Sequence, residues 1–428
     1  MTPEPATGPG TMEMRVFGMS AERGRWMFVI VGLVINLCLG SIYAWSVFRK
    51  PLQSYFSVGA TESLLPFIIF LAVFAITMPL VGGILDRYGP RRLTVIGGVV
   101  VGIGWILGSQ SSSMTMLSLT YGIIGGAGVG IVYNAPIGVA GRWFPDRRGL
   151  AVGATLLGFG LSPLITAPLA NAMMAPNGIV IPGLVLPTLG YMGIAFLVII
   201  AVLGLLLRFP PAGWSPAGAG VKAGAIACQD LDRSAMIRTK GFWGLWVCFL
   251  IGTLAGLMAI GISSPVGQEV FALSAGISAA LVGVFAVFNG IGRPIFGHLV
   301  DRTSPRTGAV VNLAIILVAA LLLGGGSSAG ASWVYILGFS ALWLCLGGWL
   351  AIAPACTGAF CGTKYYGPCY GLVFTAYGAG AIAGNLLAGN LRDIFGSYVT
   401  VFYPVAILAA IGIAVAYFLM VPSHQEKT

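Results

Sequence analysis

The chain has 428 residues, of which 57% are hydrophobic and only 8% are charged. A soluble domain carries roughly a quarter of its residues charged, so this composition excludes a cytosolic enzyme, a secreted disulfide scaffold and a disordered chain. The formal net charge of +10 does not indicate a nucleic-acid partner, because a chain this apolar is expected to place its cations in cytoplasmic loops. We therefore expect an all-α membrane protein.

Twelve apolar runs are long enough to cross a bilayer as helices, which takes about 20 residues each. In chain order they cover residues 26–47, 63–85, 93–109, 115–140, 150–171, 187–207, 242–264, 277–300, 309–324, 332–358, 370–391 and 398–420. This pattern predicts a flexible tail at 1–25, one six-helix bundle at 26–208, a central loop at 209–240, a second bundle at 241–420, and a tail at 421–428.

The distribution of cations predicts the orientation. With an even number of spans, both termini lie on one side of the membrane, and most lysines and arginines fall in loops on that side. The loops on the other side hold Arg49, Lys50 and Arg392. By the positive-inside rule, both termini are expected in the cytoplasm, with the protein in a bacterial inner membrane.

The cysteines indicate neither a metal site nor a cofactor. They form no CxxC pair and have no histidine cluster nearby, so we interpret them as small buried apolar residues. They are Cys38, Cys228, Cys248, Cys345, Cys356, Cys361 and Cys369.

Two similar segments lie about half the chain apart, after the second and eighth runs. They are Gly83-Ile84-Leu85-Asp86-Arg87-Tyr88-Gly89-Pro90-Arg91-Arg92 and Gly297-His298-Leu299-Val300-Asp301-Arg302-Thr303-Ser304-Pro305-Arg306. The chain is thus predicted to hold two copies of a six-helix unit. Two parallel repeats around a central cavity are typical of a secondary transporter.

The first segment resembles the loop signature of the major facilitator superfamily, and the second is a degenerate copy. The resemblance covers essentially the whole chain and implies two pseudo-symmetric six-helix bundles. A charge cluster at these helix ends can hold the halves together on the cytoplasmic side in one state and release them in another. The alternative is that its cations only orient the chain. The expected gating residues are Asp86, Arg87, Arg91, Arg92, Asp301, Arg302 and Arg147.

A second match narrows the resemblance. Residues 142–153, Arg-Trp-Phe-Pro-Asp-Arg-Arg-Gly-Leu-Ala-Val-Gly, resemble the helix 5 signature of monocarboxylate porters, with Trp143 and Asp146 in place of its Tyr and Lys. They resemble the oxalate/formate antiporter branch more closely. The segments at 43–45 and 289–294 also resemble that branch.

Arg293 is the one cation that falls within a predicted span, roughly 10 Å from the helix end at 1.5 Å per residue. Gly290, Gly292 and Pro294 loosen its helix, and Asn289 shares its face. Intramembrane cations are usually functional, although Arg293 could instead snorkel to the interface. The carboxylates lie in loops, tails or near span ends, so the natural partner of Arg293 is a transported carboxylate that fits its fork. The family resemblance implies the same role.

A single cation favours a single carboxylate. Oxalate exchangers carry a second cation in helix 11, and the resemblance aligns Tyr377 with it. Aromatic residues at this depth are usually packing, yet hydroxyls and amides around Arg293 outline a small pocket. It would suit lactate, pyruvate, acetate, glycolate or formate. The expected lining is Asn289, Asn36, Tyr43, Tyr133, Asn134, Phe159, Phe374 and Tyr377.

The expected function is therefore monocarboxylate transport by a non-enzyme that works as a monomer. Its partners are the bilayer, the small carboxylate and a co-transported proton. Asn289 stands where monocarboxylate porters carry an Asp, so the usual proton carrier is missing, and His298 is expected near the cytoplasmic end. Exchange of one carboxylate for another remains the alternative. A sensor or a drug exporter of the same fold is less compatible with the absence of a large soluble domain and of an embedded acid.

Overall fold

The computed structural model describes residues 14–211, 214–216, 231–326, 331–362 and 365–420. The start of the expected N-terminal tail, much of the central loop, the C-terminal tail and Cys228 lie outside these ranges. Within them, twelve helical spans are long and apolar enough to cross a membrane. The prediction of an all-α protein with twelve transmembrane helices in two bundles is confirmed.

The first bundle, the N half, follows a two-stranded hairpin, and its opening span continues through η1 to the end of α2. Its elements are β1 (Arg15–Val16), β2 (Met19–Ser20), α1 (Ala21–Leu39), η1 (Gly40–Ala44), α2 (Trp45–Phe56), α3 (Ala60–Gly82), α4 (Leu85–Tyr88), α5 (Pro90–Gly108), α6 (Met114–Leu117), η2 (Ser118–Gly125), α7 (Gly126–Trp143), α8 (Arg148–Met174), η3 (Pro182–Leu184) and α9 (Val185–Gly204).

In the second bundle, the C half, α11 to α15 extend a few residues beyond most bounds of the apolar runs. Its elements are α10 (Arg233–Ile237), α11 (Lys240–Glu269), α12 (Ala275–Arg302), α13 (Pro305–Gly326), α14 (Ser332–Cys361), α15 (Tyr366–Phe395), η5 (Tyr398–Val401) and α16 (Phe402–Leu419).

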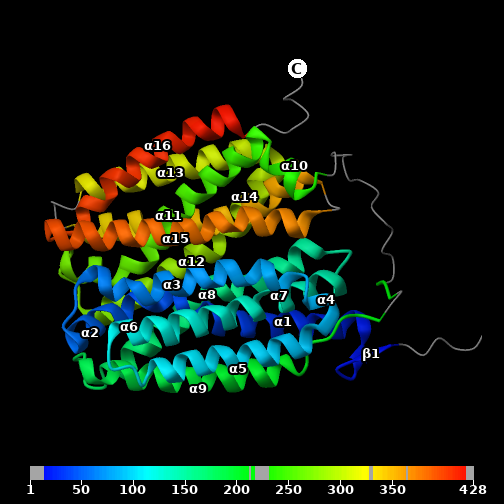
Figure 1. Ribbon diagram of the computed structural model, residues 1–428, viewed down its shortest axis with the longest axis horizontal. Coiled ribbons are helices and arrows are strands. Elements are labelled where there is room, and N and C mark those ends of the chain that lie inside the picture. Colours follow the sequence, from blue (N-terminus) through cyan, green and yellow to red (C-terminus); the bar gives the residue numbers. More distant parts are fainter. Residues whose placement is uncertain (1–13, 212–213, 217–230, 327–330, 363–364, 421–428) are drawn as a thin grey trace, which may run out of the picture.

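The two halves lie side by side along their helices, with the C half above the N half in Figure 1. They meet through α3 against α15 and through α8 against α12. Each of these pairs joins one helix of the first repeat to one of the second. Any site at these two contacts is therefore built from both halves.

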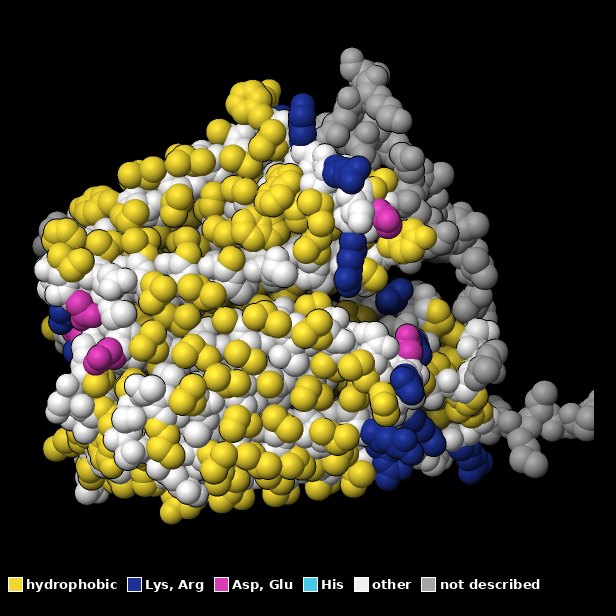
Figure 2. All heavy atoms as spheres, in the orientation of Figure 1, with side chains coloured by type: hydrophobic (Ala, Val, Ile, Leu, Met, Phe, Trp, Pro, Cys, Tyr) yellow, Lys and Arg dark blue, Asp and Glu magenta, His cyan; other side chains and the backbone are white. Residues whose placement is uncertain are grey.

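The two ends of the molecule differ in charge. Arginines and lysines gather at the end that carries α4 and α10, on the right of Figure 2, and we call it the basic end. At the opposite end, called the far end, α3 begins and α11 and α15 end, so it carries the carboxylates of Glu62, Glu269 and Asp393. Figure 2 also shows the surface hollowed between the two halves at the basic end.

The six described cysteines are free and buried, as expected of small apolar residues. The expectation that Arg293 is the only cation within a span is wrong. Arg25 lies in α1 and Arg49 in α2, and both are buried. Arg49 was expected in a loop because it ends an apolar run, but the helix continues past it to Phe56.

Candidate functional site

Arg293 lies inside the molecule on α12, with 8% of its surface exposed. Its Nη1 donates to the carbonyl oxygen of Leu156 on α8 at 2.8 Å, which links the C half to the N half. Its Nε and Nη2 are buried and have no hydrogen-bond partner among the described residues. Within the residues that the structure describes, Arg293 makes no ion pair.

The two unpartnered nitrogens of Arg293 are adjacent on one edge of the guanidinium. That edge presents two parallel N–H groups, which match the two oxygens of a carboxylate. A buried cation without a counter-ion is costly. The arrangement is therefore suited to an anion that is not part of the chain.

Four tyrosines lie close enough to Arg293 for its charge to act on their hydroxyls. They are Tyr43, Tyr133, Tyr370 and Tyr377. Two of them bond to each other, because the Tyr43 and Tyr377 hydroxyls are 2.7 Å apart and fully buried. Tyr133 and Tyr370 are only partly buried and make no hydrogen bond within the described residues, so their hydroxyls remain available.

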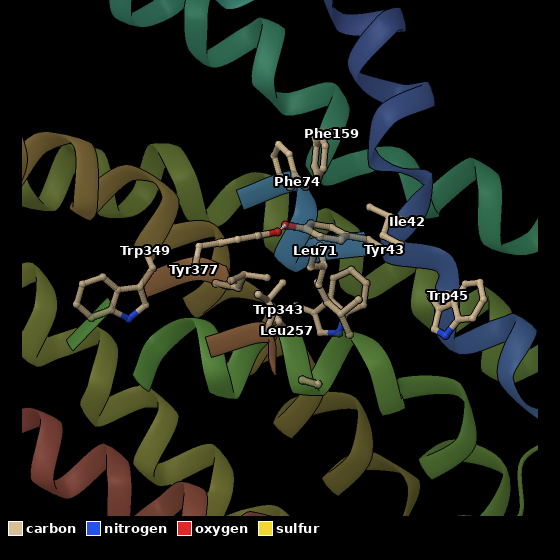
Figure 3. Packing of buried hydrophobic residues seen from close by; sticks show 14 of the residues in the cluster. Ile42, Tyr43, Trp45, Leu71, Phe74, Phe159, Leu257, Trp343, Trp349 and Tyr377 are labelled. Atoms are coloured by element: carbon tan, nitrogen blue, oxygen red, sulfur yellow. Dashed lines mark hydrogen bonds between the residues drawn. The ribbon is translucent and has the colours of Figure 1, made fainter. Parts of the chain in front are cut away.

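The Tyr43–Tyr377 bond joins the two halves at mid-depth, since Tyr43 is in η1 and Tyr377 in α15. Figure 3 shows the two rings pointing toward each other, with Phe74 and Phe159 on one side and Trp343 on the other. Gly40 places η1 this deep, because the backbone of Phe159 on α8 leaves no room for a side chain there.

Aromatic rings pack around these hydroxyls. Phe74 of α3 is the central ring, with centroids 5.2 Å from Tyr133, 6.1 Å from Phe159 and 5.8 Å from Phe374. Tyr133 and Phe159 meet edge to face at 5.5 Å. The result is an aromatic cluster of α3, α7, α8 and α15 with a cationic group and hydroxyls at its edge.

The three predicted asparagines are held largely by backbone. Asn36 donates to the Gly32 carbonyl at 2.9 Å, Asn134 to that of Met78 at 2.8 Å, and Asn289 to that of Trp343 at 3.1 Å. The side-chain oxygens of Asn36 and Asn289 are buried without a donor. Asn289 thus fixes α12 against α14 and keeps one free acceptor.

The structure brings five predicted residues together, namely Tyr43, Tyr133, Phe159, Phe374 and Tyr377, and adds Phe74, Tyr370 and Trp343. Tyr370 could have been found, since it lies on the helical face of Phe374 and Tyr377 at i, i+4 and i+7. Phe74 and Trp343 could not, because apolar helices facing lipid carry similar aromatics.

The far end is closed by contacts between the halves. Glu269 of α11 pairs with Lys50 of α2 and with Arg392 of α15. Asp393 of α15 accepts from the backbone N–H groups of Ala60 and Thr61, each at 2.9 Å. These N–H groups belong to the first turn of α3, where a carboxylate also meets the positive end of the helix dipole.

Arg49 adds to the closure of the far end. It is fully buried, and all three of its guanidinium nitrogens donate. Within the N half it reaches the Ser63 hydroxyl and the Ala60 carbonyl, and in the C half the Gly261 carbonyl and the Tyr398 hydroxyl. Each guanidinium nitrogen of this arginine therefore already donates to a protein oxygen.

At the basic end, the described ion pairs of the predicted gating segment lie within the N half. Asp86 pairs with Arg142 of α7, and Arg87 lies over the ring of Tyr88. Arg25 binds Asp146 through two hydrogen bonds of 2.6 and 2.8 Å. These bonds hold the pKa of the Asp146 carboxyl below its ordinary value.

The remaining predicted gating residues are on the surface. Arg91, Arg92, Asp301 and Arg302 are exposed and make no ion pair within the described residues, while Arg147 is 4.0 Å from Asp146. Tyr133 and Tyr370 remain partly exposed, and the surface between the two halves is hollowed at the basic end.

Comparison with known proteins places these features in a family. The family described as "Major Facilitator Superfamily" matches residues 29–367. The oxalate:formate antiporter of Oxalobacter formigenes is 29% identical, over 92% of this chain and 91% of that protein. Monocarboxylate transporter 2 of Mus musculus is 27% identical, over 88% of this chain and 80% of that protein.

Among solved structures, a bacterial homologue of the human lysosomal transporter Spinster in an inward-facing and occupied conformation has a TM-score of 0.70. It is 15% identical and covers 92% of this chain and 96% of that one. This likeness concerns the fold.

Proposed function

The chain belongs to the major facilitator superfamily, and from that premise we propose that it carries small monocarboxylates across a membrane by alternating access. It is an integral membrane transporter and not an enzyme. In our proposal, lactate, pyruvate or a similar anion binds between the halves with its carboxylate on Arg293.

The observation that carries the proposal is the free edge of Arg293. Nε and Nη2 are buried, adjacent and unpartnered. A bidentate carboxylate would satisfy both and neutralise a buried guanidinium that has no described ion pair. The Tyr133 and Tyr370 hydroxyls and the Phe74 ring would then surround the rest of a short anion.

The charge of the candidate site around Arg293 favours a substrate with one carboxylate over a substrate with two. A dianion would need a second open cation, and all three guanidinium nitrogens of the buried Arg49 already donate to protein oxygens. Tyr377 is neutral and bonded to Tyr43. The names of the two relatives, one an oxalate:formate antiporter and one a monocarboxylate transporter, support a carboxylate substrate in general.

Alternating access assigns roles to the two ends. The far-end contacts of Glu269, Asp393 and Arg49 would hold the transporter open to the basic end and would break when it opens the other way. The charge cluster around Asp86 would close the basic end in that second state. By the positive-inside rule we assign the basic end to the cytoplasm of a bacterial inner membrane, with a single chain as the functional unit.

For the coupling we propose proton symport, which lets the empty and the loaded transporter carry the same charge. The proton would travel on the substrate or on a transient site. Exchange is the second candidate, and one observation favours it. Empty Arg293 has no described counter-ion, so returning it across the membrane without an anion is costly.

A flux assay in proteoliposomes tests both parts. An inward proton gradient should drive labelled lactate into empty vesicles. Uptake that requires vesicles preloaded with another carboxylate would instead establish exchange. Arg293→Lys keeps the charge but loses the planar fork, so uptake should fall roughly 100-fold. The control Arg238→Lys changes an exposed arginine outside the candidate site and should transport normally. Wild-type uptake by Arg293→Lys would refute the site.

A further inference from the structure

A groove on the outer surface of the N half combines exposed arginines with apolar walls. It lies at the basic end, where the start of α5 meets the chain that follows α9, and has a volume of about 570 Å³. Arg91 and Arg92 line it from α5 and Arg208 from beyond α9, while Val95, Ile96, Leu205 and Leu207 form its apolar part.

The three arginines of this groove have no protein counter-ion within the described residues. All are exposed, and the ion pairs of this region use other residues, namely Asp86 with Arg142 and Asp146 with Arg25. Their charges therefore meet at one place without a carboxylate to balance them.

The groove is held by fixed backbone on both sides. Trp143 of α7 donates to the carbonyl oxygen of Arg208 at 2.8 Å, which fastens the chain after α9 to the N half. On the other side, Gly89 has a φ of +78° and Pro90 begins α5. This turn needs glycine, and it sets Arg91 and Arg92 at the start of the helix.

The apolar walls continue toward the far end along the same two helices. Ile96 is 56% exposed, and Ile103 on α5 and Val198 and Val202 on α9 are also exposed. In a membrane protein, such a face is in contact with lipid chains. A ligand that binds the arginines thus has a continuous apolar surface below it.

We propose that this groove binds one anionic phospholipid. Its phosphate would lie among Arg91, Arg92 and Arg208, and its acyl chains would run down α5 and α9. The position is complementary in both charge and depth, because cations at a helix end meet headgroups and the neighbouring apolar side chains meet the hydrocarbon region. The proposal places a lipid ligand beside the segment around Asp86 and is independent of the transported substrate.

Native mass spectrometry of the full, delipidated chain tests the site with phosphatidylglycerol as the probe. Phosphatidylcholine with the same acyl chains serves as the zwitterionic comparison. The variant R91Q/R92Q/R208Q empties the groove of charge. The matched variant R15Q/R23Q/R238Q removes the same charge from exposed positions elsewhere at this end. Thermal unfolding of both variants checks that they are folded.

We expect the wild type and the matched variant to prefer phosphatidylglycerol over phosphatidylcholine. The groove variant should bind phosphatidylglycerol roughly 100-fold more weakly, since each arginine at an anionic surface contributes about a factor of five. R91K/R92K/R208K keeps the charge and should retain most of the binding, which guards against a loss caused by misfolding.

Two results would overturn the proposal. Equal losses in the groove variant and the matched variant would mean that only net charge attracts the lipid. Equal binding of glycerophosphoglycerol, which has the headgroup without acyl chains, would mean that the groove takes a soluble phosphate instead.

Discussion

Two buried arginines of this transporter differ in how many of their guanidinium nitrogens are hydrogen-bonded. Arg49 has no exposed surface, and all its nitrogens donate to hydroxyl or carbonyl oxygens of both halves. Arg293 is nearly as buried but has one bond, to the Leu156 carbonyl, and two empty nitrogens. Burial alone does not distinguish a structural cation from a binding cation, whereas the number of unmet donors does.

The comparison predicts opposite outcomes for the same substitution at the two arginines. Arg49→Met should lower the free energy of unfolding by about 3 kcal/mol, because it removes the Arg49 donors from the buried Gly261 carbonyl oxygen and Tyr398 hydroxyl. Arg293→Met should abolish lactate uptake but leave that free energy unchanged or higher, because it removes an unpartnered buried charge. Thermal unfolding in detergent and uptake in proteoliposomes measure the two effects.

If Arg293→Met lowered the free energy of unfolding as much as Arg49→Met, both arginines would have a structural role. The distinction between a structural and a binding arginine would then be wrong. Arg306→Met is the control, because Arg306 lies over the ring of Tyr417 at 4.2 Å near the surface and should change either quantity only slightly.

The closure at the far end gives a smaller effect. Asp393→Asn weakens the hold of α15 on the first turn of α3, and the far end should open more often. A cysteine at Ser264, which lines a far-end cavity, should then react about tenfold faster with an impermeant thiol reagent, equivalent to roughly 1.4 kcal/mol. Glu62→Gln removes a nearby charge without this contact, and a rate increase there as large as for Asp393→Asn would contradict the role of the latter.

The hydrogen bond between the Tyr43 and Tyr377 hydroxyls should contribute about 1 kcal/mol to the free energy of unfolding. A double-mutant cycle with Tyr43→Phe, Tyr377→Phe and the double variant isolates this coupling. Additive changes in the unfolding free energy would show that the two hydroxyls do not depend on each other.

The smallest effect concerns the Arg25–Asp146 pair at the basic end. Its carboxyl has a lowered pKa in the folded protein, so its stabilisation is present above the unfolded pKa and is lost as the pH falls through the folded pKa. Asp146→Asn should cost less than about 1 kcal/mol at pH 7, and the difference from wild type should disappear in acid. A difference independent of pH would exclude the ion pair as its source.

The sequence was sufficient to predict the fold, because hydropathy alone defines twelve spans and the repeated segments define two halves. It also singled out Arg293, since a cation in an apolar run stands out. It misplaced Arg49, because nothing in the local sequence shows that Ser63, Gly261 and Tyr398 would surround a charge at the end of an apolar run. Partners that distant in the chain meet only in the folded protein.

Only part of the pocket was predicted, because its residues also come from distant parts of the chain that meet only in the folded protein. Tyr43, Tyr133 and Tyr377 were recognisable as hydroxyls inside apolar helices, but the pairing of Tyr43 with Tyr377, which leaves Tyr133 free, depends on how the halves meet. Phe74 became central only because α3 packs against α15.

The most direct test of the account is a structure of the transporter with lactate bound. We predict both carboxylate oxygens on Arg293, one about 2.7–2.9 Å from Nε and the other equally close to Nη2, with the Leu156 bond retained. Lactate bound elsewhere, with those two nitrogens still unpartnered, would contradict the central claim.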